Sequence, residues 1–372
     1  MSDQDEIIAF LQQGSAYGKP KEEVSRIDTH AAMIFLVGDR AFKVKRAVRY
    51  DFLDFSTLEK RKDALEAELR LNRRTAPKLY RRTLPVCRDD DGLLTLDGDG
   101  KAVEWLLVMR RFDQAGLLDK LALAGDLDPE VMEPLAAAIA DLHEQAEART
   151  DGGGYDAMKE VIRGNHEDLA EARAKGMIEQ DVEWLHAETS KSLDDHRQHL
   201  DRRRKQGFVR HCHGDLHLGN IVLIDKAPIL FDCLEFDENL AIIDTFYDLA
   251  LLLMDLCHRD LRPLAQRLLN DYLELTGDDE GTALLPLFIA MRAAMRAKVG
   301  ALKAEQIEQG DDRRAVLEDV ADYLDLARRA LRPEPPILLA IGGVSGTGKR
   351  RLPLTWRRSS ARCPARFICA AT

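Results

Sequence analysis

"FVRHCHGDLHLGNIVLIDKAPILFDCLEF", residues 208–236, is the stretch of sequence that decides the fold. Asp215 stands in a polar loop after a short apolar run, Asn220 follows five residues later, and Asp232 ends the next apolar run. We expect these side chains to converge at the ends of strands. Magnesium prefers a few oxygen ligands together with substrate phosphates, so Asn220 and Asp232 suit a magnesium–nucleotide site. Asp215 then suits a base that accepts the proton of an attacking hydroxyl.

The same residues allow two other interpretations. Aspartate and asparagine are common in loops, so an isolated pair would indicate turn chemistry alone. Here a His-Gly pair precedes Asp215 and a second aspartate follows, which favours the catalytic interpretation. Histidines and a cysteine within 211–217 invite a zinc site, but no outer pair of ligands completes it at a familiar spacing.

Upstream of this stretch, the pattern predicts strands and one helix. Residues 31–48 predict two strands joined by a tight turn at Gly38-Asp39. A helix is expected from about 57 to 74, since Ser56 followed by Glu59 forms a capping-box pattern. Further strands are expected after it, of which the strongest covers residues 102–112.

Downstream, the pattern is mainly helical apart from the quoted stretch. A small β-rich lobe with one helix, followed by a larger helical lobe, predicts an α+β fold and excludes an alternating βαβ arrangement. Helices are expected at 116–123, 129–146, 155–175, 180–206, 240–275 and 283–332. The predicted parts are a nucleotide-binding lobe at 1–113, a helical lobe at 114–332 and a terminal fragment at 333–372.

The quoted motif resembles the catalytic loop of the aminoglycoside phosphotransferase group of kinase-like folds, whose signature is His-Gly-Asp, then Asn, then a magnesium-binding Asp. Residues 241–256, "AIIDTFYDLALLLMDL", resemble the helix that supports this loop, with Asp248 in the supporting role. Residues 104–112, "EWLLVMRRF", resemble the segment that holds adenine through its backbone, which includes Met109. The resemblance covers roughly residues 25–330 and implies a bilobal protein-kinase-like fold that uses ATP and Mg²⁺.

The resemblance also assigns roles to individual residues. Asp215 would be the catalytic base, and Asn220 and Asp232 would bind Mg²⁺. His213 would hydrogen-bond the backbone of the loop, as its counterpart does in that group, and we include it with the cofactor-site residues.

A lysine on the second strand would reach the α- and β-phosphates and pair with a glutamate of the helix. Lys43 and Lys45 both qualify, because side chains two apart on a strand point to the same face. Glu68 is the preferred partner and Glu66 the alternative.

The terminal fragment resembles the start of a second domain. Residues 38–61, "GDRAFKVKRAVRYDFLDFSTLEKR", are similar to a bacterial subgroup that is often fused to a C-terminal P-loop domain. Gly343, Gly348 and Lys349 match the first seven positions of the phosphate-loop pattern, but Arg350 replaces the expected Ser or Thr. We therefore expect a vestigial phosphate loop in a truncated, frameshifted P-loop domain.

Composition narrows the function further. The net charge of −11 disfavours a nucleic-acid partner, and no apolar run is long enough for a membrane span. Six scattered cysteines without a CxxC pair suit a reducing cytoplasm. We expect a cytoplasmic ATP- and Mg²⁺-dependent phosphotransferase that acts on a small-molecule hydroxyl. The alternative is a nucleotide-binding regulatory module, a pseudokinase that served the P-loop partner.

Overall fold

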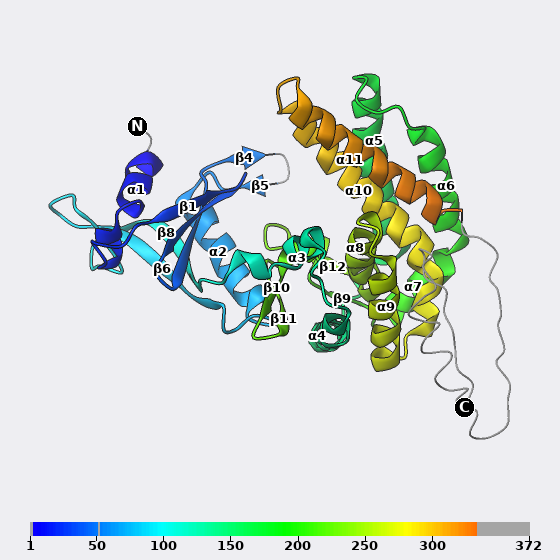
Figure 1. Cartoon of the computed structure of the whole chain (residues 1–372), viewed down its shortest axis with the longest axis horizontal. Coiled ribbons are helices and arrows are strands. Elements are labelled where there is room, and N and C mark those ends of the chain that lie inside the picture. Colours follow the sequence, from blue (N-terminus) through cyan, green and yellow to red (C-terminus); the bar gives the residue numbers. More distant parts are fainter. Residues whose placement is uncertain (1–2, 51–52, 333–372) are drawn as a thin grey trace.

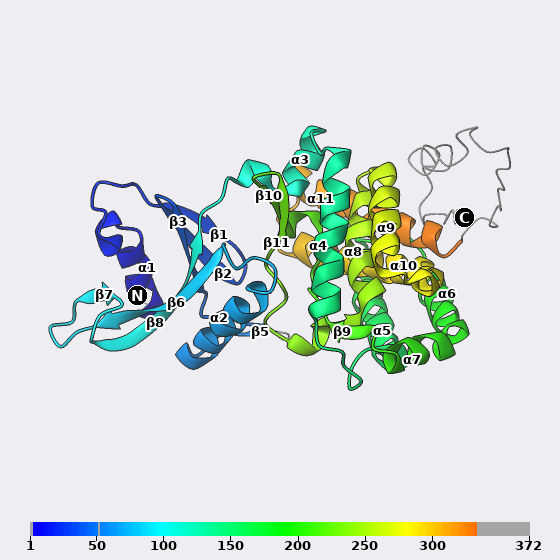
Figure 2. The same cartoon turned by 90° about the horizontal axis from the view of Figure 1, so that it is seen from below.

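The structure is a computed structural model that describes residues 3–50 and 53–332. A sheet-rich N-terminal lobe and a helical C-terminal lobe lie side by side and meet at the segments around β10 and β11 (Figures 1 and 2). Among the described residues, no helix combines the length and the apolar character that a membrane span requires. The predicted phosphate loop with Gly343, Gly348 and Lys349 lies outside the described residues.

The N-terminal lobe is built on a six-stranded antiparallel sheet in the order β1-β2-β3-β8-β6-β7. The predicted turn at Gly38-Asp39 is confirmed, since it joins β2 to β3. A first strand, β1, was not predicted. The strands are β1 (Ser25–Asp28), β2 (Ala32–Val37), β3 (Arg40–Lys45), β6 (Tyr80–Arg88), β7 (Leu94–Leu96) and β8 (Lys101–Arg110).

Strand alternation gives this sheet two different faces. Leu106 and Val108 of β8 pack in one apolar cluster with Ile7 and Leu11 of helix α1 (Asp3–Leu11). Leu107, between them, packs in a separate cluster with Leu65 of helix α2 (Leu58–Asn72). The two helices therefore cover opposite faces (Figure 2), and α2 lies on the face of Lys43, since Lys43 stands opposite Leu107 and contacts Glu68 of α2.

Helix α2 begins with a different cap from the one predicted. The Thr57 side chain accepts a hydrogen bond from the Lys60 backbone N–H, so Thr57 is the N-cap. Ser56 instead bonds Asp54 through both its backbone N–H and its hydroxyl. Ser56, the predicted capping residue, therefore belongs to a turn that precedes the helix.

The C-terminal lobe surrounds helix α8, in which every residue from Thr245 to Cys257 is buried. Its apolar side chains belong to one cluster shared with the helices around it. The helices are α3 (Leu118–Ala124), α4 (Met132–Gln145), α5 (Gly154–Ala174), α6 (Val182–Asp195), α7 (Arg197–Lys205), α8 (Thr245–His258), α9 (Arg262–Thr276), α10 (Leu285–Glu305) and α11 (Asp311–Ala330).

Three predicted long helices are wrong, because each is divided. The segment 180–206 breaks at His196, which leaves helical geometry between α6 and α7. The segment 240–275 begins as a strand and breaks again near Asp260, whose φ of 57° lies in the left-handed region. The segment 283–332 breaks before Gly310, where α11 begins.

Short strand pairs frame the loops between the lobes. Strand β9 pairs with β12, which starts immediately before α8, and β10 pairs with β11 as a hairpin. The motif quoted above therefore contains one strand of the β9–β12 ladder, which leads directly into α8, and the whole β10–β11 hairpin. These strands are β4 (Arg49–Tyr50), β5 (Leu53–Asp54), β9 (Val209–His211), β10 (Ile221–Ile224), β11 (Ala227–Leu230) and β12 (Ile242–Asp244).

Arg203 in α7 is fully buried, although the basic run 201–205 has the composition of a solvated helix end. Its guanidinium donates to Asp244 at 2.8 and 3.0 Å and to Asp278 at 2.6 and 2.7 Å. Asp244 also caps α8 by accepting from the Phe246 backbone N–H at 2.9 Å. Arg203 thus fixes the start of the central helix.

We expect Arg203→Ala to lower the free energy of unfolding by about 3–5 kcal/mol, because it leaves two buried carboxylates without their cation. Urea unfolding followed by circular dichroism measures the change. Arg202→Ala is the matched control, since the neighbouring Arg202 side chain is 56% exposed and should change stability by only about 0.5 kcal/mol. Equal effects of the two substitutions would contradict this assignment.

Candidate active site

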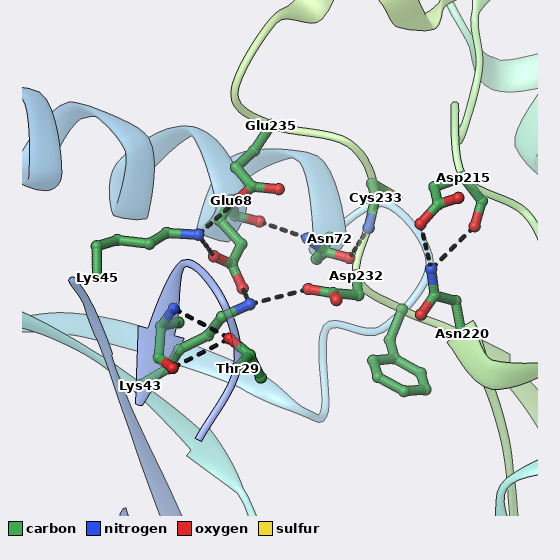
Figure 3. A network of polar contacts seen from close by, with 12 residues as sticks. Thr29, Lys43, Lys45, Glu68, Asn72, Asp215, Asn220, Asp232, Cys233 and Glu235 are labelled. Atoms are coloured by element: carbon green, nitrogen blue, oxygen red, sulfur yellow. Dashed lines mark hydrogen bonds and ion pairs between the residues drawn. The ribbon is translucent and has the colours of Figure 1, made fainter. Parts of the chain in front are cut away.

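The loop between β9 and β10 brings Asp215 and Asn220 together (Figure 3). The Asn220 side-chain amide donates to the Asp215 backbone carbonyl at 2.9 Å and to its carboxylate at 3.0 Å. His217 Nε2 lies 3.4 Å from the same carboxylate, which remains 41% exposed. Desolvation raises the pKa of Asp215, but the hydrogen bond and charge of His217 outweigh it and hold that pKa below its usual range. Asp215 is therefore an accessible carboxylate in a fixed orientation.

Asp232 is the second residue of the loop after β11 and has a left-handed backbone, φ 60°. Residues of the N-terminal lobe hold this loop through its backbone. The Asp232 N–H donates to the Tyr80 hydroxyl at 3.1 Å, and the next N–H, of Cys233, donates to the Asn72 side chain at 2.9 Å. The Asp232 carboxylate accepts from Lys43 at 2.9 Å. The two lobes are thus joined at the predicted metal ligand.

Asp248 lies beneath the loop and is fully buried. Its carboxylate accepts from the backbone N–H groups of His213 at 3.1 Å and Gly214 at 2.9 Å. The imidazole of His143 in α4 lies 3.1 Å from the same carboxylate and 2.8 Å from the Tyr272 hydroxyl. Burial alone would raise the pKa of Asp248. The hydrogen bond and charge of His143 outweigh burial, so the pKa lies below its ordinary value. This arrangement gives Asp248 the supporting position expected of it.

Gly214 and His213 complete the loop geometry. Gly214 has φ 85°, and a Cβ there would lie 2.9 Å from the Leu234 Cβ, so the turn requires glycine. The His213 imidazole lies 3.0 Å from the backbone carbonyl of Phe231, the residue before Asp232. His213 therefore connects the loop of Asp215 to the loop of Asp232 and contacts backbone.

The two lysines of β3 share one glutamate of α2. Lys43 and Lys45 each lie 2.7 Å from Glu68, one on each carboxylate oxygen. Glu66, the alternative partner, is exposed and lies 3.7 Å from Lys62 instead. Glu68 is therefore the glutamate that the fold brings to the lysines.

Besides Glu68, each lysine contacts a second carboxylate, and this second partner differs between Lys43 and Lys45. Lys43 continues to Asp232, whereas Lys45 contacts Glu235 at 2.5 Å, three residues further along the same loop (Figure 3). Burial lowers the pKa of Lys43, but Asp232 and Glu68 raise it well above its ordinary value. Burial is likewise outweighed at Lys45, where Glu68 contributes most to a raised pKa. Both lysines are charged at neutral pH.

A cleft of about 620 Å³ lies at the end of the sheet. Its walls include the β2–β3 turn at Gly38-Asp39 and the segment 111–114 that follows β8. Met109, the predicted adenine-site residue, lies in β8 opposite Ala41 of β3, two residues before this segment. The cleft is thus continuous in sequence with the strand expected to hold adenine.

Sequence reasoning missed several residues of the site. His143 could have been suspected, because a histidine on the apolar face of an amphipathic helix is unusual without a partner. No local pattern indicates Arg74, whose guanidinium donates to the backbone carbonyls of His211 at 2.6 Å and Cys212 at 3.0 Å. Glu235 was likewise missed, since its partner lies 190 residues away in sequence.

Comparisons with known proteins agree with this geometry. Residues 38–285 match the model of the phosphotransferase enzyme family. An uncharacterized protein of Mycobacterium tuberculosis is 32% identical over 329 residues, which are 87% of this chain. The chain spans about 63% of the length of that relative.

Two solved structures share the fold. A choline/ethanolamine kinase family protein from Mesorhizobium loti has a TM-score of 0.53 and 15% identity, over 89% of this chain and 98% of that one. A Plasmodium vivax ethanolamine kinase has a TM-score of 0.50 and 13% identity, over 84% of this chain and 85% of that one. The predicted bilobal, kinase-like α+β fold is confirmed.

We expect Asp248→Asn to lower the free energy of unfolding by about 3 kcal/mol at pH 7, because the loop loses a charged acceptor. The folded-state pKa of Asp248 lies below the unfolded value of about 3.9, so its contribution is present above that value and is lost as pH falls through the folded pKa. The difference between wild type and variant should therefore shrink below about pH 4.

Urea unfolding at pH 7 and below pH 4 tests this dependence. Asp260→Asn serves as the control, since the Asp260 side chain is 87% exposed and asparagine tolerates its left-handed backbone. A difference that does not change with pH would rule out the carboxylate charge as its source.

Proposed function

The chain belongs to the phosphotransferase enzyme family, and from this premise we propose that it is a kinase that transfers the γ-phosphoryl group of ATP to a hydroxyl of a small molecule. One observation carries the proposal. Separate segments of both lobes turn carboxylate, amide and ammonium groups toward one place, and these groups belong to Lys43, Glu68, Asp215, Asn220 and Asp232 (Figure 3).

In the proposed reaction, the acceptor hydroxyl attacks the γ-phosphorus while its proton passes to the carboxylate of Asp215. A new O–P bond forms, the bond from the γ-phosphorus to the bridging oxygen breaks, and ADP leaves. Asp215 suits this role because its carboxylate is exposed to an acceptor and oriented by Asn220 and His217. Its lowered pKa keeps it ionised, so it orients the hydroxyl and receives the proton late in the transfer.

Asn220 and Asp232 fit the predicted magnesium site by the chemistry of their donor atoms. The Asn220 amide nitrogen donates to Asp215, which leaves its carbonyl oxygen to face a ligand. One carboxylate oxygen of Asp232, Oδ1, accepts a hydrogen bond from Lys43, and Oδ2 is the oxygen we propose as the metal ligand. An amide oxygen and a carboxylate oxygen are ligands of the kind that Mg²⁺ takes alongside phosphates. Bound there, Mg²⁺ would neutralise charge on the phosphates of ATP.

Of the two lysines, we propose Lys43 as the phosphate ligand. Its side chain is 11% exposed and already contacts Asp232, whereas Lys45 is 2% exposed and enclosed between two glutamates. Lys43 can therefore turn to a phosphate while it keeps Glu68. The base of ATP would occupy the cleft beside Met109 and the segment 111–114.

We expect Asp215→Asn to reduce acceptor-dependent turnover by about 10²–10⁴-fold, because asparagine cannot take the proton of the substrate hydroxyl. Binding of Mg–ATP should remain, since Asp215 is not proposed to contact the nucleotide. A thermal-shift screen of hydroxyl metabolites with a magnesium–ATP analogue identifies the acceptor, because a ligand of the folded state raises the melting temperature. ADP release with that acceptor then measures turnover.

Asp225→Asn is the control for this experiment. Asp225 is exposed in the β10–β11 turn, and asparagine tolerates its φ of 52°. Wild-type turnover by Asp215→Asn would refute the role of Asp215. Magnesium-dependent ATP binding without turnover of any acceptor would favour a regulatory, pseudokinase module in place of an enzyme.

A further inference from the structure

Five charged side chains form a continuous series in which the sign of the charge alternates. We call it the ion-pair chain, and its order is Asp232, Lys43, Glu68, Lys45, Glu235 (Figure 3). Every neighbouring pair lies between 2.5 and 2.9 Å. The series contains three carboxylates and two ammonium groups, so its net charge is −1.

The ion-pair chain begins and ends on one loop. Asp232 and Glu235 lie three residues apart after β11, while the two lysines come from β3 and Glu68 comes from α2. The loop of the C-terminal lobe therefore closes around the lysine strand of the N-terminal lobe. Of the two lysines in the ion-pair chain, Lys43 contacts Asp232, the predicted metal ligand, and Lys45 contacts Glu235.

Glu68 is fully buried, and each of its oxygens is engaged by a different lysine. Without Lys45, Lys43 would be the single cation among three carboxylates, and both oxygens of Glu68 would be free to hold it. An ammonium held in this way is less able to turn toward a phosphate, because a buried charge retains the partners that compensate it.

We propose that Lys45 and Glu235 act as a pair of positioning residues that fix Glu68, so that Lys43 stays available to the phosphates of ATP. The proposal rests on the function proposed above. Lys45 acts through Glu68, and Glu235 acts through Lys45. Neither side chain is a ligand of the nucleotide.

The test compares binding of phosphate-bearing and phosphate-free ligands. We expect Lys45→Met and Glu235→Ala each to weaken binding of a magnesium–ATP analogue about tenfold, as measured by calorimetry. The double variant should also bind about tenfold more weakly, because the two residues act as one unit. Affinity for adenosine, which carries no phosphate, should stay the same in all variants.

A pure charge effect predicts a different pattern. Lys45→Met makes the site more negative and Glu235→Ala makes it less negative, so charge alone would weaken binding in the first and strengthen it in the second. The double variant would then bind as wild type does. That pattern, or unchanged analogue binding in both single variants, would overturn the positioning role.

Two control variants remove the same charges, one lysine or one glutamate, outside the ion-pair chain. Lys62→Met removes a half-buried lysine of α2 that lies 3.7 Å from Glu66, and Glu238→Ala removes an ion pair between Arg70 of α2 and the loop that follows Glu235. Both controls should bind the analogue as wild type does. If Lys45→Met does not fold, as its melting curve would show, Glu235→Ala and Glu238→Ala decide the question. A wild-type protein that fails to bind the analogue would overturn the proposed function, and the positioning role with it.

Discussion

A carboxylate in the middle of a helical lobe has to be surrounded by hydrogen-bond donors, and Asp248 finds two of them in the backbone of the loop that carries Asp215. The requirement acts in both directions. The buried charge is compensated only when the loop adopts this turn, and the turn is held only while the charge is present. The His143 imidazole approaches the same carboxylate from α4, so three segments of the chain meet there: α8, α4 and the loop of His213 and Gly214. The accessible orientation of Asp215 follows from this arrangement.

The contact between the lobes runs through backbone groups as well as ion pairs. Asn72 ends α2 and bonds the backbone of the loop after β11, and Arg74, two residues later, bonds the backbone carbonyls of His211 and Cys212. Helix α2 is therefore tied to the same loops that carry Asp215 and Asp232. The lysine strand, by contrast, reaches these loops only through side chains.

Sequence patterns predicted the features that local spacing encodes. The hairpin around Gly38-Asp39 and the α+β order of elements belong to this class, because turn chemistry and periodicity act over a few residues. Features that depend on partners distant in sequence were not predictable. Arg203 is buried only because Asp244 and Asp278 converge on it, and Glu235 matters only because Lys45 lies opposite. The break at His196 carries no glycine or proline, so tertiary packing decides it.

The left-handed backbone of Asp232 also affects how this fold can diverge. Besides glycine, asparagine and aspartate are the residues that adopt such a conformation most readily, so few substitutions keep the turn. Asparagine is one of them, and it removes the negative charge while it leaves the backbone unstrained. A single nucleotide change can thus abolish the charge without straining the turn. A descendant that keeps this turn but lacks the charge at position 232 therefore lies one mutational step away.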